Sequence, residues 1–254
     1  MKKIVFGFII ILVFGNEDGT LKNILITGGS GGIGRALVES FAASFGNVYF
    51  TYNKNETAAR EISEKTGAIA IKCDASVAEE IKSAVSAAGQ IDVLINNAGV
   101  SQIKLFGDLS DSEIKNMIDI NLTAAMIFAR EVLPGMISRK SGRIINIGSV
   151  WGRCGASCEV HYSAAKAGLR GFTFALAKET GPSGITVNCI EPGFIETEMN
   201  SALKPDEIAS LIEATPLGRA GTPIDVASLA IFLAGDGASF ITGQIIGVDG
   251  GFGL

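Results

Sequence analysis

Two side chains that could transfer a proton lie four residues apart near the middle of the chain. Tyr162 and Lys166 occur in the segment HYSAAKAGL, and Ser149 precedes the tyrosine by thirteen residues. Residues four apart share one face of a helix, so a helix here would place the phenol beside the ammonium group. A free tyrosine has a pKa of about 10, and a nearby cation lowers it towards the pH at which general acid–base catalysis is efficient. The spacing therefore predicts a proton-donating tyrosine, although it also occurs by chance in ordinary helices.

A glycine-rich segment near the start of the chain has the pattern of a dinucleotide-binding loop. It reads TGGSGGIG from Thr27 to Gly34, between a predicted strand at 23–27 and a predicted helix at 32–45. Glycines let the backbone approach a pyrophosphate, whose charge the helix N-terminus attracts. We therefore expect cofactor contacts from Gly28, Ser30, Gly31, Gly32, Ile33 and Gly34.

The end of the second predicted strand bears on which nicotinamide cofactor binds. NAD-selective sites usually place Asp or Glu there to bind the ribose hydroxyls. This chain has Asn53 and Lys54 at that point and no carboxylate. Lys54 would attract a 2′-phosphate, so the segment favours NADP(H) over NAD(H). The alternative is that Lys54 is a solvated loop charge.

Apolar runs and helix-length amphipathic segments alternate from residue 23 onward. We predict strands at 23–27, 48–52, 68–73, 92–96, 143–148, 185–190 and 244–248, and helices at 32–45, 56–66, 77–88, 112–137, 162–179, 205–213 and 223–234. Continuous apolar strands are typical of a parallel sheet buried on both faces. Strict alternation therefore predicts an α/β fold: one doubly wound Rossmann domain over residues 21–254, with a seven-stranded parallel sheet and helices on both faces.

Further polar residues follow the predicted strands, at the edge where α/β proteins bind ligands. The segment NNAG (96–99) follows the fourth strand, Ser149 the fifth and Pro192-Gly193 the sixth. Asn121 lies within the long predicted helix, where asparagine is a mediocre helix former. Its amide could bond back to the helix or organise water near Lys166.

Composition argues against two other classes of function. The formal net charge is −5, and no basic run extends beyond Arg139-Lys140, which gives nucleic-acid binding little support. The cysteines have no CxxC spacing and His161 is the only histidine, so no metal site is expected. We expect the cysteines to be small buried side chains in a reducing compartment, and His161 to be a bystander or part of the substrate-pocket wall; the cysteines are Cys73, Cys154, Cys158 and Cys189.

Residues 1–20 form an N-terminal extension of uncertain role. Lys2-Lys3 precede an apolar run from Ile4 to Phe14, which resembles the hydrophobic region of a signal peptide. The run is too short to span a bilayer as a helix, and no A-x-A pattern follows it. We therefore expect a cytoplasmic protein, with membrane contact through residues 4–14 as the alternative.

These segments, in this order, resemble the short-chain dehydrogenase/reductase family. The resemblance rests on TGxxxGxG, NNAG, Asn121, Ser149, Tyr162-x-x-x-Lys166 and Pro192-Gly193, and covers residues 21–254. The segments GRIINIGSV, YSAAKAGL, GITVN, PGFIET and ITGQIIGVDGG look most like the bacterial 3-oxoacyl-[acyl-carrier-protein] reductases. The resemblance implies an NADP(H)-dependent ketone reductase of fatty acid biosynthesis. It also implies a homotetramer built on the helices at 112–137 and 162–179, both rich in apolar residues.

The resemblance further implies a role for each site residue. Tyr162 would give a proton to a carbonyl oxygen while hydride moves from the nicotinamide, and Ser149 would orient that carbonyl. Lys166 would bind the nicotinamide ribose and lower the Tyr162 pKa, and Asn121 would hold a water molecule in the proton relay. Asp74 would contact the adenine amino group. Further cofactor contacts are implied at Ala75, Asn97, Ala98, Gly99, Pro192, Gly193, Ile195 and Thr197.

Two departures from these relatives concern the cofactor and the partner. Gly31 stands where NADP-dependent relatives often carry a basic residue, which weakens the prediction of NADP(H). Ser183 stands where the carrier-protein reductases carry an arginine implicated in docking acyl carrier protein. Arg139, Lys140 and Arg143 remain available for that partner.

The loop before the tyrosine suggests a second substrate class. It reads WGRCGASCEVHY over residues 151–162 and places Glu159 in the expected substrate wall. A carboxylate there suits a cationic substrate better than a fatty acyl chain. The pattern looks like that of the reductases acting on the 5-aminopentanone modification of elongation factor P. The simpler interpretation of Glu159 is a solvated loop charge.

A non-catalytic dinucleotide sensor is a more remote alternative. Family members of that kind usually lack the tyrosine or the lysine, and this chain retains both Tyr162 and Lys166.

Overall fold

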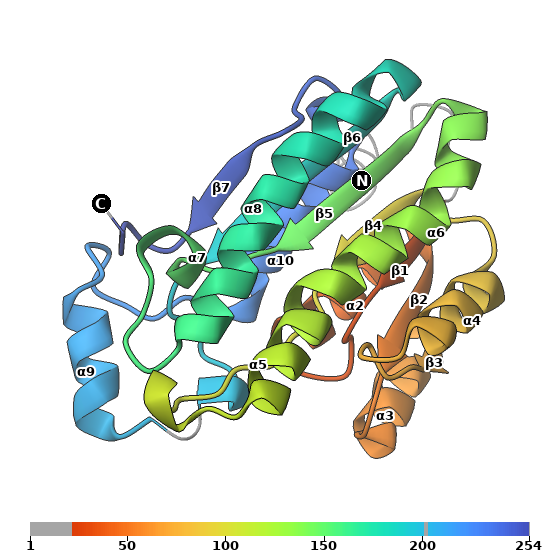
Figure 1. The fold of residues 1–254 in the computed structure, drawn as a ribbon. Coiled ribbons are helices and arrows are strands. Elements are labelled where there is room, and N and C mark those ends of the chain that lie inside the picture. The colour runs from red at the N-terminus through yellow and green to blue at the C-terminus, as the bar shows by residue number, and fades with distance from the viewer. Residues whose placement is uncertain (1–21, 201–202, 254) are drawn as a thin grey trace.

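Seven parallel strands form one sheet in the order β3-β2-β1-β4-β5-β6-β7 (Figure 1). The computed structural model describes residues 22–200 and 203–253, so the predicted N-terminal extension lies outside the described residues. Residues 24–26 of β1 pair with both β2 and β4, which makes β1 an interior strand of the sheet. The strands are β1 (Lys22–Ile26), β2 (Gly46–Tyr52), β3 (Ile69–Lys72), β4 (Val93–Asn96), β5 (Gly142–Ile147), β6 (Ile185–Pro192) and β7 (Ile245–Val248).

Helices cover both faces of the sheet (Figure 1). Ile24 and Ile26 of β1 pack with apolar residues of α2, α3 and α10, whereas Leu25 packs with residues of α4, α6 and α8. Successive strand side chains point to opposite faces, so each apolar strand serves two cores. The helices are α2 (Gly32–Ser44), α3 (Glu56–Thr66), α4 (Ala78–Ala88), α5 (Asp111–Ile118), α6 (Ala124–Arg139), α7 (Trp151–Cys154), α8 (Val160–Thr180), α9 (Pro205–Glu213) and α10 (Pro223–Ala234).

The long helix before β5 differs from its prediction in two ways. It continues to Arg139, two residues past its predicted end, with Pro134 inside it. It also contains a π-helical turn, η2 (Asp119–Thr123), between α5 and α6. The helix spans Asp111–Arg139 and is long and apolar enough to cross a membrane, with a mean hydropathy of 1.3 over its most apolar 18 residues. Its residues Phe128, Ala129, Val132 and Met136 are buried against the sheet, which accounts for that composition.

The predicted fold class is confirmed. Each predicted strand is present, with its ends moved by one or two residues, because the apolar runs are local and continuous. Sequence analysis missed α7, a single turn between Ser149 and Tyr162, and the π turn around Asn121.

Candidate active site

A cavity of about 880 Å³ opens where the strands end and their following loops begin. All the residues predicted for catalysis, cofactor binding or substrate binding line this one cavity. They are Gly28, Ser30, Gly31, Gly32, Ile33, Gly34, Asn53, Lys54, Asp74, Ala75, Asn97, Ala98, Gly99, Asn121, Ser149, Glu159, Tyr162, Lys166, Pro192, Gly193, Ile195 and Thr197.

The glycine loop packs tightly on its inner side and is open towards the cavity. Gly28 has φ of +66°, and a Cβ there would lie 2.9 Å from the Ala98 Cα. A Cβ on Gly34 would overlap the carbonyl oxygen of Gly28 and lie 2.7 Å from Asn97 Nδ2. At Gly31 the nearest atom would be Glu198 Oε2, 3.9 Å away. Packing therefore requires glycine at positions 28 and 34, whereas Gly31 leaves room on the cavity side.

The N-terminus of α2 has no side-chain cap, in contrast to α3 and α5. Side chains of Asn55 and Ser110 accept hydrogen bonds from the first turns of those two helices. Gly31 at the start of α2 provides no such cap, and the first turn contains no acidic residue. The backbone N–H groups of that turn are thus left for an anion, so a dinucleotide pyrophosphate fits this end of the cavity.

Hydrogen bonds join the glycine loop to the NNAG segment. Thr27 Oγ1 accepts from the backbone N–H of Asn97 (2.9 Å) and of Ala98 (2.8 Å). Asn97 Nδ2 donates to the carbonyl oxygens of Thr27 and Gly28, both at 3.0 Å. Thr51 Oγ1 accepts from the Gly28 N–H at 3.1 Å. Sequence reasoning missed Thr27 and Thr51, and their position at strand ends is the signal that could have found them.

Where β2 and β3 end, the cavity wall carries the carboxylate of Asp74, which is fixed by hydrogen bonds. Hydrogen bonds from Ser76 lower the pKa of Asp74, with further contributions from the Asn53 amide and the Lys54 charge. Asp74 therefore stays ionised, with Asn53 and Lys54 on the same wall. The charge of Lys54 thus already acts on this carboxylate.

Lys166 is buried on α8, one helical turn after Tyr162. Its side chain is 4% exposed, and Nζ donates to the Ile147 carbonyl oxygen at 2.8 Å. Burial lowers the pKa of Lys166 to about 8. The nitrogen lies 5.7 Å from the centroid of the Tyr162 ring, so the predicted pairing of the two residues is present.

The predicted effect of Lys166 on Tyr162 is wrong for this structure. Burial raises the pKa of Tyr162 to about 12, with the Glu159 charge adding to the rise and a hydrogen bond with Ser149 opposing it. The physical reason is that desolvation penalises the phenolate, and Lys166 is itself a desolvated cation that donates to a backbone carbonyl. Tyr162 consequently keeps its proton at neutral pH.

The π turn places the Asn121 amide against the loop after β4. Its Oδ1 accepts from the Val100 N–H at 3.2 Å, and Nδ2 donates to the carbonyl oxygens of Val100 and Met117 at 3.0 Å. Of the two roles considered for this amide, the structure shows bonding back to the helix, and the water-holding role stays a prediction. Gly99 permits the approach, since a Cβ there would lie 2.7 Å from Asn121 Oδ1 and 3.6 Å from Lys166 Nζ.

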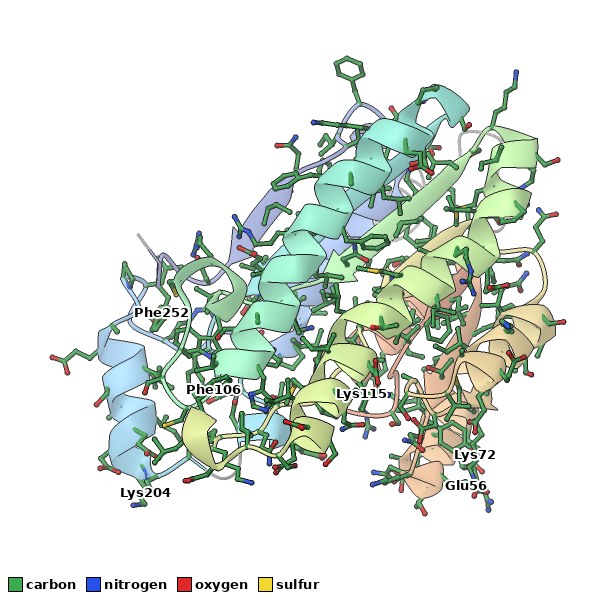
Figure 2. The ribbon with its side chains drawn as sticks, in the orientation of Figure 1. Glu56, Lys72, Phe106, Lys115, Lys204 and Phe252 are labelled. Carbon is green, nitrogen blue, oxygen red and sulfur yellow. The ribbon has the colours of Figure 1, made fainter. Side chains whose placement is uncertain are left out.

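On the segment before Tyr162 the cavity wall bears a carboxylate and an indole. These are Glu159 and Trp151, and burial raises the pKa of Glu159. A further carboxylate of the cavity, that of Glu198, lies by the glycine loop, 3.9 Å from a Cβ built on Gly31. Sequence reasoning did not select Trp151 or Glu198. Figure 2 shows Phe252 beside α7, where its ring meets the Trp151 ring edge-on at 5.3 Å between centroids.

Several other predicted residues lie outside the cavity. His161 is 2% exposed and is not among the residues that line the cavity. Cys73 and Cys189 are buried as expected, but the expectation is wrong for Cys154, which is exposed, and for Cys158, which is half-buried, since both lie in the segment between β5 and α8 and not in the core. Among the described residues no group of His, Cys, Asp and Glu is arranged to hold a metal ion.

The basic residues considered for partner docking lie at the opposite end of the strands. Arg143 is the second residue of β5, and Ser149 follows the other end of the same strand. Arg139 donates to the Ile91 carbonyl oxygen at 2.7 Å and pairs with Asp92 at 3.2 Å. Arg143 is largely buried and donates to the Gly142 carbonyl oxygen. Both arginines therefore serve internal contacts within this chain.

Comparison with known proteins identifies the relatives of this chain. The family model described as enoyl-(acyl carrier protein) reductase matches residues 28–253. The oxidoreductase YmfI of Bacillus subtilis, itself uncharacterized, is 39% identical over 238 residues, covering 91% of this chain and 98% of the relative. The 3-oxoacyl-[acyl-carrier-protein] reductase FabG of Salmonella typhimurium is 39% identical over 236 residues, covering 91% and 96%. A crystal structure of a proposed gluconate dehydrogenase from Agrobacterium tumefaciens matches with a TM-score of 0.87 and 32% identity, covering 91% and 95%.

Fold, cavity and relatives together define an NAD(P)-dependent oxidoreductase. The chain belongs to the short-chain dehydrogenase/reductase family, as its motifs predicted, and within it resembles the 3-oxoacyl-[acyl-carrier-protein] reductases.

Proposed function

We propose that this protein is an NADP(H)-dependent reductase of ketones, similar in activity to the 3-oxoacyl-[acyl-carrier-protein] reductases. The observation that carries the proposal is the convergence of Asn121, Ser149, Tyr162 and Lys166 with the glycine loop on one cavity. These residues come from four separate elements, and their meeting at the carboxyl edge is what a positioned acid–base site requires.

The cofactor would lie along the wall from Lys54 and Asp74 to the loop at Pro192. Gly31 and the first turn of α2 would hold its pyrophosphate, and Asn97, Lys166 and Thr197 its nicotinamide end. When bound, the nicotinamide supplies a hydride to the carbonyl carbon.

Tyr162 would donate the proton that the reduction needs. Its pKa of about 12 keeps the phenol protonated at neutral pH, which suits an acid in the direction of reduction. Ser149 would donate a hydrogen bond to the substrate carbonyl and so orient it. Lys166, with a pKa of about 8, can lose and regain a proton near neutral pH and would return one towards Tyr162, with Asn121 holding water beside it.

Removing the phenol hydroxyl tests this function. With acetoacetyl thioester and NADPH, followed by absorbance of the reduced nicotinamide, we expect Tyr162→Phe to lower kcat about 10²- to 10⁴-fold. Tyr49 lies on β2 outside the cavity, so Tyr49→Phe is the matched control and should keep normal turnover. Wild-type kcat in Tyr162→Phe would refute the proton-donor role. Turnover of any ketone by the wild-type protein would eliminate the alternative of a non-catalytic sensor.

A second candidate substrate is a ketone that carries an ammonium group, as in the 5-aminopentanone modification on elongation factor P. The observation that favours it is Glu159, which lines the cavity close enough to raise the Tyr162 pKa. Trp151 offers a ring face for a cation. A fatty acyl chain gains nothing from the Glu159 carboxylate.

The Glu159→Gln variant separates the two substrate classes. For an aminoketone we expect the KM to rise about tenfold, because a charge-assisted hydrogen bond is lost. For the neutral acetoacetyl thioester KM should be unchanged or lower. An equal change for both substrates would argue that Glu159 contacts neither.

The partner and the assembly follow from the same proposal. A carrier-bound substrate would bring acyl carrier protein or elongation factor P to the cavity mouth. With Arg139 and Arg143 engaged internally, Lys140 is the remaining basic residue of the three predicted for docking acyl carrier protein. We further propose a cytoplasmic homotetramer, supported by the exposed apolar residues Met126 and Ile137 on α6 and Phe174 on α8. A monomer by light scattering at micromolar concentration would refute the assembly.

A further inference from the structure

A chain of hydrogen bonds behind the cavity joins the loop after β4 to the first turns of α5 and α8. Gln102 lies at its centre. Gln102 Nε2 donates to Glu113 Oε1 at 2.6 Å, and Gln102 Oε1 lies 3.3 Å from His161 Nε2. Glu113 is in the first turn of α5, and His161 is in the first turn of α8. One side chain thus connects two helices whose starts lie close together in Figure 1.

The chemistry of Glu113 fixes the orientation of this chain. Lys104 Nζ donates to both carboxylate oxygens at 2.9 Å, and the Ser110 N–H donates to Oε2 at 2.8 Å. These bonds, that from Lys104 first, lower the pKa of Glu113, so it is ionised and only accepts. Gln102 must then turn its NH₂ group to Glu113 and its oxygen to His161. His161 Nε2 therefore carries the proton and donates it to Gln102.

A backbone contact completes the connection. The Lys104 N–H donates to the Cys158 carbonyl oxygen at 2.8 Å. Cys158 has φ of +63°, a left-handed conformation that side-chain-bearing residues rarely adopt. This bond joins the loop that carries Glu159 to the loop that carries Gln102. The residue that makes it, Cys158, has an unfavourable backbone conformation of the kind that is common at functional sites.

The loop after β4 is not held in place by burial of its apolar side chains. Ile103, Leu105 and Phe106 are 62%, 64% and 56% exposed, and Figure 2 shows Phe106 at the outer surface near the first turn of α8. The loop therefore gains little from burial of its own apolar side chains. Beyond Val100, which Asn121 holds, its position depends on the bonds made by Gln102 and Lys104.

We propose that Gln102 is a positioning residue for the substrate side of the cavity. Val100 and Ser101 line the cavity directly before it, and Glu159 and Tyr162 flank its partner His161. By joining the two segments, Gln102 fixes the distance between the walls that enclose the ketone. This inference rests on the proposed ketone reductase function and adds a residue that does not touch the reacting atoms.

The test removes both hydrogen bonds and keeps the side-chain size. In Gln102→Leu we expect the KM for the ketone to rise about tenfold, because two part-buried hydrogen bonds are lost. The kcat should change less than about threefold and the Kd for NADPH should stay the same, since neither Tyr162 nor the cofactor wall is altered. Gln90 is exposed and outside the cavity, so Gln90→Leu is the matched control and should change neither value.

Two variants of His161 distinguish the loss of the hydrogen bond from a general loss of packing around position 102. His161→Leu should raise the ketone KM as Gln102→Leu does, whereas His161→Gln keeps an N–H donor towards Gln102 and should restore a near-normal KM. A loss of packing alone would affect both His161 variants alike, and that result would overturn the proposal.

Hydrogen exchange gives a readout that needs no turnover. In the cofactor-free protein the Lys104 amide should exchange about tenfold faster in Gln102→Leu than in the wild type, because the loop opens more often. An unchanged Lys104 amide together with an unchanged KM would overturn the positioning role and leave the ketone reductase intact. Loss of turnover in the wild type would instead refute the proposed function, and the exchange result would still decide whether Gln102 holds the loop.

Discussion

The two ends of the cavity are held by different kinds of contact. At the cofactor end, Gly28 and Gly34 fit against backbone atoms, and Thr27 accepts hydrogen bonds from the backbone of the NNAG segment. At the substrate end, the walls are joined by side chains, chiefly Gln102 and Glu113. Backbone geometry supports binding of a group common to many enzymes, whereas side-chain contacts can change with the substrate.

The comparison predicts which kind of substitution each end tolerates. At the cofactor end, which is built on backbone contacts, adding a Cβ to a packed glycine should abolish cofactor binding. Changes of surface charge should have little effect on binding there, except next to a charged group of the ligand. An end built on side chains should respond in KM to the loss of single hydrogen bonds. The three predictions below test the cofactor end and the lysine that lies where the two ends meet.

The largest effect is expected at Gly34. In Gly34→Ala the new Cβ would overlap the Gly28 carbonyl oxygen, which cannot move without shifting the whole loop. We expect the free energy of unfolding to fall by at least about 3 kcal/mol and NADPH binding to be lost. Gly31→Ala is the matched variant for stability, since its Cβ would meet only Glu198 Oε2 at 3.9 Å, and its unfolding free energy should stay within about 0.5 kcal/mol. Equal stability of the two variants in urea unfolding would show that the loop is not fixed by packing.

The next effect concerns the buried Lys166. Its folded-state pKa of about 8 is lower than its ordinary value of 10.5, so the folded protein binds fewer protons than the unfolded chain between these values. The free energy of unfolding therefore rises as the pH increases from about 8 to about 10.5. Below pH 8 the burial of the charged Lys166 destabilises the folded protein to its full extent. Tyr162, whose pKa is raised to about 12, acts in the opposite sense, but only above its ordinary value of 10.0.

Lys166→Met should thus stabilise the cofactor-free protein while abolishing its proposed role in catalysis. We expect the free energy of unfolding at pH 7 to rise by roughly 2 to 3 kcal/mol, after allowance for the unpaired Ile147 carbonyl oxygen. Urea unfolding at pH 7 and pH 9.5 measures the effect, and the gain should shrink at the higher pH. Lys178→Met on the exposed side of α8 is the control. A gain of equal size at both pH values would show that Lys166 is not held at a lowered pKa.

The sequence predicted the cofactor end more completely than the substrate end. Glycine and asparagine motifs report backbone requirements within a few residues, so the strand, loop and helix around Gly28 to Gly34 could be placed from local pattern alone. Even there, Thr51 was missed, because its bond to the Gly28 N–H crosses from β2 to the loop after β1.

The substrate end depends on contacts that no local pattern reports. Gln102 and His161 are separated by 59 positions in the sequence, and the π turn at Asn121 accompanies bonds to Val100, 21 positions away. The spacing of Tyr162 and Lys166 correctly predicted a pair, yet it contained no information on burial. Burial decided the direction of both pKa shifts, and so reversed the predicted effect on Tyr162.

The smallest effect is expected at the adenosine end, where Lys54 would meet a 2′-phosphate. Lys54 is exposed, and part of its field already acts on Asp74, so its contribution to binding is modest. In Lys54→Glu we expect the KM for NADPH to rise about tenfold, with the KM for NADH nearly unchanged, and the NADPH effect should weaken as salt is added. Lys82→Glu on α4 makes the same change in net charge away from the cavity and should leave both values as they are. Equal KM changes for the two cofactors would place Lys54 away from the phosphate, and the preference for NADP(H) would then need another basic group on this wall.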